Sequence, residues 1–227
     1  MPLIGIAGDV VEPRPGSVRS QCGITYALAV WRAGGMPVIL PPLVEIIPEV
    51  LRQCDGFVLT GGDDPRTEPF GEPTHPKAEP VHPVRQAFDT ALLGALMHRP
   101  ETPALGVCLG MQMMALVGGG KLNQHLPDTL PSAGEHWNNG KHRVVPVVGD
   151  AGRLGIAEGL VTSHHRQAVS ESGRLRVCAM SEDGVTEAIE LPGARFFLGV
   201  QWHPERTEHG TLGPGLFERL VAAARER

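Results

Sequence analysis

Short apolar runs and amphipathic segments alternate along the first half of the chain. The apolar runs have the length of buried strands, and the segments between them carry apolar residues at helical spacing. The strands expected on this basis are 3–7, 36–40, 57–60 and 104–107. The expected helices are 24–33, 46–53, 87–98 and 111–117. Strands that alternate with helices predict a parallel sheet that is covered on both faces.

The second half of the chain has a different pattern, in which short β-like runs follow one another. These runs are 144–148, 175–179, 186–190 and 196–201, and the chain closes with a helical segment at 216–224. We therefore expect an α/β fold whose mixed sheet is parallel in its first half and partly antiparallel in its second. Residues 63–83 have no periodicity and many prolines, which predicts a long surface loop.

Length and composition narrow the possible functions. The 227 residues suit a single domain over 1–227, and 20 basic against 25 acidic side chains, with no basic block, argue against nucleic acid as a partner. The chain lacks a run of about 20 apolar residues and a signal-like start, so we expect a cytoplasmic protein without a membrane partner. Its four cysteines form no CxxC pair, which indicates neither a disulfide framework nor a cysteine zinc site.

Cys108 lies where an expected strand gives way to an expected helix. Gly106 and Gly110 flank it in a GxCxG pattern, which is typical of a nucleophile elbow because glycines leave room for a strained turn. The dipole and free N–H groups of the following helix favour the thiolate, the reactive form of cysteine. The pattern is short, however, and a buried, unreactive cysteine at a strand end is the alternative.

Two further signals accompany this cysteine. His203 follows an expected strand and can act as base and acid, while Glu205, two residues on, can reach the ring and hold its tautomer. Gly61 and Gly62 follow the strand 57–60, where their N–H groups can hold a developing oxyanion together with the N–H of Leu109. Taken singly, a surface or structural histidine and a simple turn are the better explanations of these residues.

In combination, these signals make the sequence resemble the class I glutamine amidotransferase superfamily. Within it, the closest likeness is to the γ-glutamyl-γ-aminobutyrate hydrolase-like cysteine peptidases. The resemblance spans nearly the whole chain and is carried by the segments 34–41, 61–64, 70–72, 106–112, 163–169, 183–184 and 201–205. It implies a flavodoxin-like three-layer sandwich with the elbow at the carboxyl end of the sheet.

The resemblance also implies a set of functional residues and a reaction. The implied catalytic triad is Cys108, His203 and Glu205, the oxyanion hole is Gly62 with Leu109, and the substrate contacts are Gln112, Ser163, His164 and His165. The cysteine would attack the carbonyl of a small-molecule γ-glutamyl amide, and water would release glutamate from the thioester. The resemblance requires neither a metal nor an organic cofactor.

Four positions depart from the family pattern. Arg166 stands in place of the second paired histidine. Arg85 is followed by Gln86 where the family has aspartate, and Asp89 stands where glutamate is usual. Leu109 replaces the arginine that often follows the nucleophile in the hydrolase branch. These departures leave the amine half of the substrate open.

Other functions remain open from the sequence. The closest alternative is a glutaminase subunit that supplies ammonia to a separate synthetase partner, since the chain has no GxxxxGK[ST] loop of its own. A metal-binding protein that uses the histidines, among them His164, His165, His203 and His209, is less favoured because none has HExxH spacing. A non-catalytic protein that kept the fold is the third alternative. The sequence leaves the formation of a homo-oligomer open.

Overall fold

The computed structural model describes residues 1–147 and 154–226. Its main element is a mixed sheet of 11 strands with the order β4-β1-β5-β6-β13-β12-β11-β8-β9, and β10 joins β12 to β7 beside this row. The strands of this sheet are β1 (Leu3–Ala7), β4 (Met36–Leu40), β5 (Gly56–Leu59), β6 (Ala104–Val107), β7 (Lys121–Asn123), β8 (Gly140–Pro146), β9 (Gly159–Ser163), β10 (Ala168–Glu171), β11 (Arg176–Ser181), β12 (Thr186–Glu190) and β13 (Phe197–Val200). A separate hairpin is formed by β2 (Asp9–Val11) and β3 (Arg19–Gln21).

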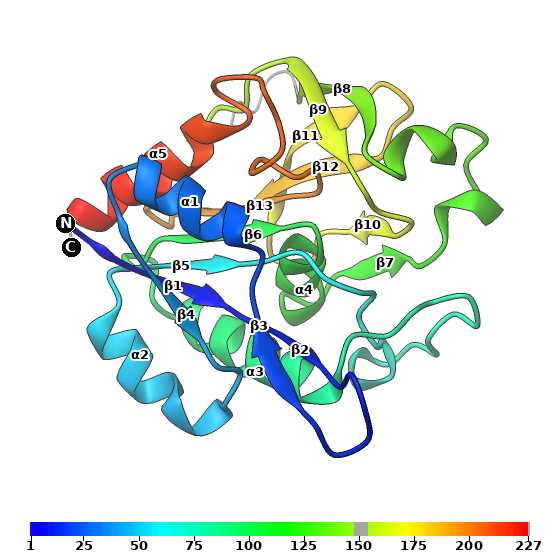
Figure 1. Cartoon of the computed structure of the whole chain (residues 1–227). Coiled ribbons are helices and arrows are strands. Elements are labelled where there is room, and N and C mark those ends of the chain that lie inside the picture. The colour runs from blue at the N-terminus through cyan, green and yellow to red at the C-terminus, as the bar shows by residue number, and fades with distance from the viewer. Residues whose placement is uncertain (148–153, 227) are drawn as a thin grey trace.

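In the described part of the chain, five α-helices cover the two faces of the parallel strands (Figure 1). The helices are α1 (Ile24–Arg32), α2 (Ile47–Gln53), α3 (Pro83–Leu96), α4 (Leu109–Val117) and α5 (Pro214–Arg225). Helices α1 and α5 share one apolar cluster with the sheet, and α2, α3 and α4 share the other. The expected three-layer α/β sandwich is therefore observed, and Figure 1 also shows the two termini side by side.

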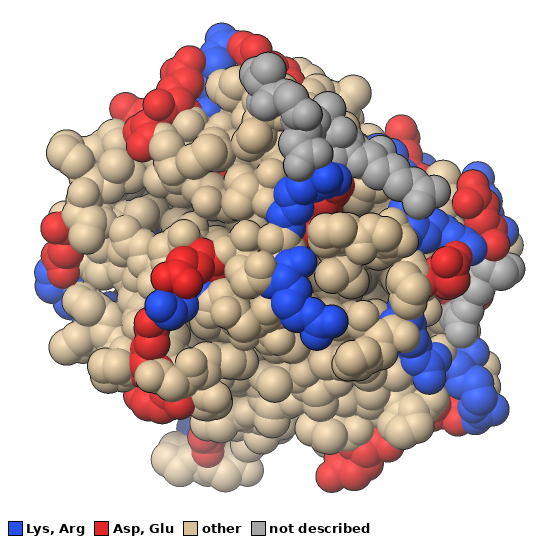
Figure 2. All heavy atoms as spheres, turned by 180° about the vertical axis from the view of Figure 1, so that it is seen from behind, with Lys and Arg blue, Asp and Glu red and all other residues tan. Residues whose placement is uncertain are grey.

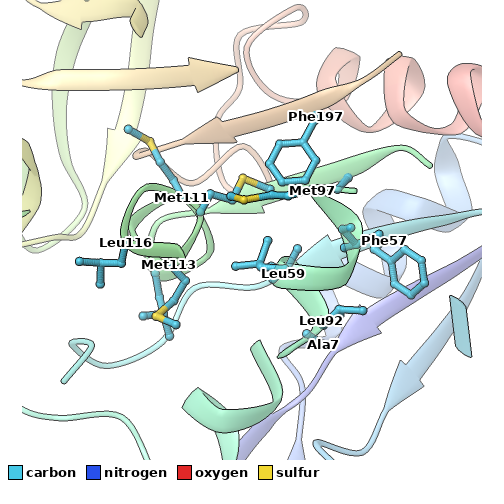
Figure 3. Packing of buried hydrophobic residues seen from close by; sticks show 14 of the residues in the cluster. Ala7, Phe57, Leu59, Leu92, Met97, Met111, Met113, Leu116 and Phe197 are labelled. Atoms are coloured by element: carbon cyan, nitrogen blue, oxygen red, sulfur yellow. The ribbon is translucent and has the colours of Figure 1, made fainter. Parts of the chain in front are cut away.

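Alternation along the strands explains why both faces of the sheet can be covered. Phe57 and Leu59 of β5 point into the cluster with α2, α3 and α4, whereas Val58 between them points into the other cluster. Figure 3 shows Leu59 beside Met111 and Met113 of α4 in the first of these clusters. These apolar contacts fix α4, and with it the residue that precedes α4, against the end of the sheet.

The pairing of β13 is the feature that matters most for the site. This strand lies in the strand-rich second half of the sequence, yet it pairs in parallel with β6, with Val200 opposite Val107. The backbone N–H of Cys108 donates to the carbonyl of Val200 over 2.8 Å. The chain that leaves β13 therefore emerges beside the chain that leaves β6, although the two are far apart in sequence.

Most of the expected elements are present, and the differences have simple causes. Helix α3 begins at Pro83 instead of residue 87, because proline is tolerated in the first turn of a helix. Helix α4 begins at Leu109, directly after Cys108, and β8 begins at Gly140; residue 148, predicted to end that strand, lies outside the described residues. The short strands β2, β3, β7, β9 and β10 were not predicted. Of these, β7, β9 and β10 make the antiparallel part of the main sheet larger than expected.

The loop expected over residues 63–83 is present over 63–82, since Pro83 begins α3, and it contains one short 3₁₀ turn (Glu68–Phe70). Within residues 1–147 and 154–226, none of the helices has the length and apolar character that crossing a bilayer demands. On the face shown in Figure 2, Lys and Arg side chains lie in small groups among Asp and Glu.

Candidate active site

Cys108 occupies a strained turn between β6 and α4. Its φ of 51° and ψ of -105° place a non-glycine residue in a region that costs about 1–3 kcal/mol. A Cβ atom on Gly106 would lie 2.8 Å from the backbone of Gly110, and one on Gly110 would lie 2.4 Å from the carbonyl oxygen of Leu59. The GxCxG pattern is thus required by a close crossing of helix and strand, and the turn leaves Cys108 on the wall of a cavity.

His203 and Glu205 follow β13 and lie next to this turn. Nδ1 of His203 is 2.8 Å from Oε1 of Glu205, whose side chain is fully buried and is also approached by Nε of Arg206 at 3.2 Å. The other face of the ring lies near Cys108: a Cβ built on Gly61 would sit 2.9 Å from Cε1 of His203 and 3.6 Å from Cβ of Cys108. The structure therefore brings the three expected residues together.

Burial shifts the pKa of His203 in one direction, and the neighbouring side chains of Cys108 and Glu205 shift it in the other. Burial disfavours the imidazolium, but the interactions with Cys108 and Glu205 outweigh it and raise the pKa of His203 to about 9. Nε2 does not yet form a well-aligned hydrogen bond with the thiol, and catalytic hydrogen bonds often tighten only when substrate binds. At neutral pH the ring is a proton donor placed beside a sulfur.

Gly61 and Gly62 follow β5 on the other side of Cys108. The N–H of Gly61 donates to the Tyr26 hydroxyl over 3.0 Å, so this group is already used. Gly62 packs closely on Leu109, because an added Cβ would lie 2.9 Å from Cδ2 of that leucine. The two residues expected to form an oxyanion hole are thus adjacent, and their role stays a prediction.

Two cavities meet at this point. The first has a volume of about 90 Å³ and is lined by Cys108 and Gln112 together with groups of both charges, including Asp64, Lys77 and Arg166. The second has a volume of about 270 Å³ and is lined by residues that include Tyr26, Gly61 and His203. Gly62, Asp63 and His164 line both. The cysteine and the histidine therefore lie where two cavities adjoin.

The expected substrate contacts differ in their surroundings. Gln112 lines the first cavity and donates to the carbonyl of Gln167 over 3.2 Å, and the ring of His164 stacks on Trp137 at 4.0 Å. Ser163 is fully buried and is absent from the described lining of either cavity. His165 reaches the first cavity, but its ring nitrogens point to other buried groups.

Several residues that shape this site could not be predicted from the sequence. Trp137 lies in an irregular segment, and it contacts both His164 and the guanidinium of Arg166, which is 4.0 Å from the indole ring. Tyr26 is a buried residue of α1, a helix that the sequence predicts from its apolar spacing alone. No local pattern marks such residues, because their contacts are made by segments far away in the chain.

Two of the positions that depart from the family pattern, Asp89 and Gln86, form supporting contacts with Arg85 and with the long loop. Arg85 is fully buried, and its Nε is 2.6 Å from Asp89 while its Nη2 donates to the carbonyl of Thr60 over 3.0 Å. Gln86 exchanges two hydrogen bonds of 2.8 Å with the backbone of Arg66 in the long loop. These residues hold the end of β5 and the start of the loop that borders the cavity.

The four histidines named for the metal-binding alternative are not brought together. His203 belongs with Cys108 and Glu205, and His209 contacts Thr211. Among the described residues, the groups with suitable spacing for a metal ion are His75 with His125 and Asp128, and His136 with His165 and Glu187.

Comparison with known proteins identifies the family. Residues 2–205 match the family described as peptidase C26. The chain belongs to this family. It is 37% identical over 98% of its length to the candidate glutamine amidotransferase Rv2859c of Mycobacterium tuberculosis, of which 75% is covered. It is 29% identical to the γ-glutamyl-γ-aminobutyrate hydrolase PuuD of Escherichia coli (strain K12), over 87% of this chain and 84% of that protein.

The fold is shared with solved structures as well. The glutaminase domain of Trypanosoma brucei CTPS, solved with acivicin bound, superposes with a TM-score of 0.64 over 100% of this chain and 95% of that chain, at 16% identity. As a member of the peptidase C26 family, the protein is a cysteine-type amidohydrolase or amidotransferase of the glutamine amidotransferase-like class.

Proposed function

We propose that this protein hydrolyses the amide bond of a γ-glutamyl conjugate through a thioester on Cys108. The observation that carries the proposal is the arrangement of His203, which holds Glu205 at 2.8 Å with one nitrogen and lies against the Cys108 side chain with the other edge of its ring. This is the geometry in which an imidazole can move a proton between a thiol and a leaving amine.

The reaction follows from these positions. The sulfur of Cys108 attacks the γ-glutamyl carbonyl while His203 holds the thiol proton, and the N–H groups of Gly62 and Leu109 stabilise the oxyanion. His203 then gives the proton to the departing amine as the C–N bond breaks. A water molecule, deprotonated by the same ring, attacks the thioester and releases glutamate and the free thiol.

The charges around the first cavity support a glutamyl group as the acyl half. A γ-glutamyl group carries an α-carboxylate and an α-ammonium, and the lining supplies Arg166 and Lys77 for one, and Asp64 and Glu79 for the other. The second cavity lies on the His203 side and would hold the amine half. The name of the E. coli relative is consistent with a γ-glutamyl amide as substrate.

A hydrolysis screen tests the proposal. Native protein is assayed on glutamine and on γ-glutamyl conjugates of aminobutyrate, of a polyamine and of short peptides, beside Cys108→Ala. Cys178→Ala is the matched control, because this cysteine is buried in β11 and burial raises the pKa of its thiol to about 12. We expect glutamate release by the native and Cys178→Ala proteins and none by Cys108→Ala.

The outcomes separate the hydrolase from other functions. A Cys108→Ala protein as active as the native one would contradict the proposal. Turnover of glutamine alone, rising strongly only when a synthetase is added, would instead favour a subunit that supplies ammonia to a partner.

A further inference from the structure

A second group of titratable side chains lies behind the wall of the first cavity. This buried histidine cluster consists of His136, His142, His165 and Glu187. His136 ends the 3₁₀ turn Ala133–His136, His142 lies in β8, His165 follows β9, and Glu187 lies in β12. The proposed hydrolysis uses none of the ring nitrogens or carboxylate oxygens of this cluster.

The distances within the cluster are those between ligands of one metal ion. Nδ1 of His136 is 3.3 Å from both Nε2 of His165 and Oε1 of Glu187, and these last two atoms are 3.8 Å apart. Ligands at about 2.0–2.1 Å around a tetrahedral zinc ion are separated by roughly 3.3 Å. We propose that the buried histidine cluster binds one zinc ion, with His136, His165 and Glu187 as ligands.

Hydrogen bonds on the far side of two rings leave the required lone pairs free. Nδ1 of His165 is 2.9 Å from the carbonyl of Gln167, which only accepts, so this nitrogen carries the proton. Nε2 of His136 is 3.0 Å from the carboxylate of Asp183, so it too carries a proton. In the neutral rings, the nitrogens that face Glu187 are therefore unprotonated. Burial disfavours a charged ring, but Glu187 and Asp183 outweigh it and raise the pKa of His136, which favours a second proton on Nδ1. A zinc ion bound to both nitrogens and Glu187 would take the place of that proton.

The remaining polar atoms of the cluster also lack partners. Among the described residues, neither carboxylate oxygen of Glu187 and neither ring nitrogen of His142 has a hydrogen-bond partner of acceptable geometry. Nε2 of His142 nevertheless lies 3.0 Å from Oε1 of Glu187. Buried carboxylates are normally paired or bound to metal. His142 does not belong to the set of residues whose ligand atoms all lie within 4.8 Å of one another, so it contacts Glu187 beside the site, and a water molecule would complete the four ligands of the ion.

The outer contacts match those of protein zinc sites. Asp183, which orients His136, itself accepts hydrogen bonds from the hydroxyls of Ser132 and Ser181. A carboxylate that orients a ligating histidine is a recurrent feature of zinc sites. A cavity of about 240 Å³, lined by residues that include His142 and Asp183, lies next to the cluster. Two imidazoles with one carboxylate suit zinc better than calcium or magnesium.

The ion would act on the cavity by fixing its wall. His136 precedes Trp137, and His165 lies between His164 and Arg166; the indole of Trp137 contacts both of those flanking side chains. Holding His136 and His165 to one ion fixes the two segments that carry this contact. The zinc is therefore a positioning group and does not touch the reacting atoms, so its binding is independent of the proposed hydrolysis.

Zinc binding is measured directly. Native protein is stripped with a chelator, titrated with zinc in competition with a chromophoric chelator, and analysed for zinc per chain; cobalt replaces zinc in a parallel titration. We expect one zinc per chain and the intense visible absorption of four-coordinate cobalt. Asp183→Asn should weaken zinc binding about 10- to 100-fold, as loss of an orienting carboxylate does, and Glu187→Gln should abolish it.

A matched variant controls for zinc that binds at a surface site instead of the buried histidine cluster. His75→Gln removes one member of the other candidate group, which is partly exposed, and should leave the affinity unchanged. If the Glu187→Gln protein does not fold, the zinc affinity of the Asp183→Asn protein tests the inference. The Asp183 side chain is partly exposed, so this variant is expected to fold. Three results would overturn the inference: no stoichiometric zinc in the native protein, the weak absorption of six-coordinate cobalt, or loss of zinc from His75→Gln but not from Asp183→Asn.

Discussion

At the scale of single residues, the state of His203 decides what the site can do. Its pKa is raised to about 9 because Cys108 and Glu205 together overcome the cost of burying a cation. A raised pKa means that the ring carries its second proton through the neutral range. The same ring that accepts the thiol proton therefore keeps it available for the leaving amine.

This raised pKa gives a pH prediction. In the folded protein His203 keeps its second proton through the neutral range and loses it as the pH rises through about 9, so kcat/KM should fall on the alkaline side near pH 9. In Glu205→Gln the carboxylate no longer favours the imidazolium, and the fall should move to lower pH. The measurement is the pH profile of both proteins, and an unchanged alkaline limb in Glu205→Gln would show that Glu205 does not tune the ring.

A second prediction concerns Gly61, which separates Tyr26 from the triad. The methyl group of Gly61→Ala would meet Cε1 of His203 at 2.9 Å and the Tyr26 hydroxyl at 3.1 Å, so the ring must move. We expect kcat to fall by at least tenfold while KM changes little, because displacement by a fraction of an ångström affects proton transfer most. Steady-state kinetics measures both constants. A variant with native kcat would contradict this prediction, because it would mean that the site accommodates the methyl group without displacing the His203 ring.

Much of the site could be predicted at this scale, and what could not has a common cause. Cys108, His203 and Glu205 lie in local sequence patterns that, in combination, predict a nucleophile with its base. The structure places the three residues together. Ser163 was named from a resemblance alone, and its side chain is buried away from both cavities. Trp137 and the buried histidine cluster depend on contacts between distant segments, which no local pattern reveals.

At the scale of elements, the elbow depends on how closely α4 crosses β5. The helix begins at the residue after Cys108, and its second residue is Gly110, whose position beside Leu59 allows no side chain. The sequence predicted the strand and the helix on either side of the cysteine from their apolar patterns. It did not predict the parallel pairing of β13 with β6, because β13 follows a series of strands that pair antiparallel.

Two glycine-to-alanine substitutions test this crossing. In Gly110→Ala the new Cβ would lie 2.4 Å from the backbone oxygen of Leu59, which cannot turn aside, so we expect a loss of about 1–3 kcal/mol in the free energy of unfolding. Gly94→Ala in α3 is the matched control, since a Cβ at this position would meet no atom within 4 Å beyond the backbone of its own helix. This variant should gain about 0.5–1 kcal/mol in the free energy of unfolding. Urea unfolding of both variants measures the difference. Equal stabilities would mean that the crossing is not tight.

At the scale of the whole molecule, Arg85 connects parts of the fold that surround the cavity. It extends from α3 to Asp89 in the same helix, to the end of β5 through Thr60, and to Asp9 of the hairpin, whose carboxylate is 3.5 Å from Nη1. Burial raises the pKa of Asp89, and the Arg85 charge opposes that effect. The ion pair therefore ties a helix, the sheet and the hairpin together in the interior.

Removing the arginine should be costly for stability. Arg85→Met leaves Asp89 buried without its partner, and such changes cost about 3–5 kcal/mol. Thermal or urea unfolding measures the loss. The double variant Arg85→Met with Asp89→Leu removes both charges and should recover part of it. A double variant that is no more stable than Arg85→Met would show that the loss comes from packing and not from the unpaired carboxylate.

The central claim is that the sulfur of Cys108 forms a covalent bond to a γ-glutamyl group. Its most direct test is mass spectrometry of the protein after brief mixing with a γ-glutamyl amide and rapid acid quenching. We predict a mass increase of one glutamyl group, located by digestion on the peptide that contains Cys108 and absent from Cys108→Ala. Turnover of the substrate with no adduct on Cys108, or with an adduct on another residue, would contradict the account.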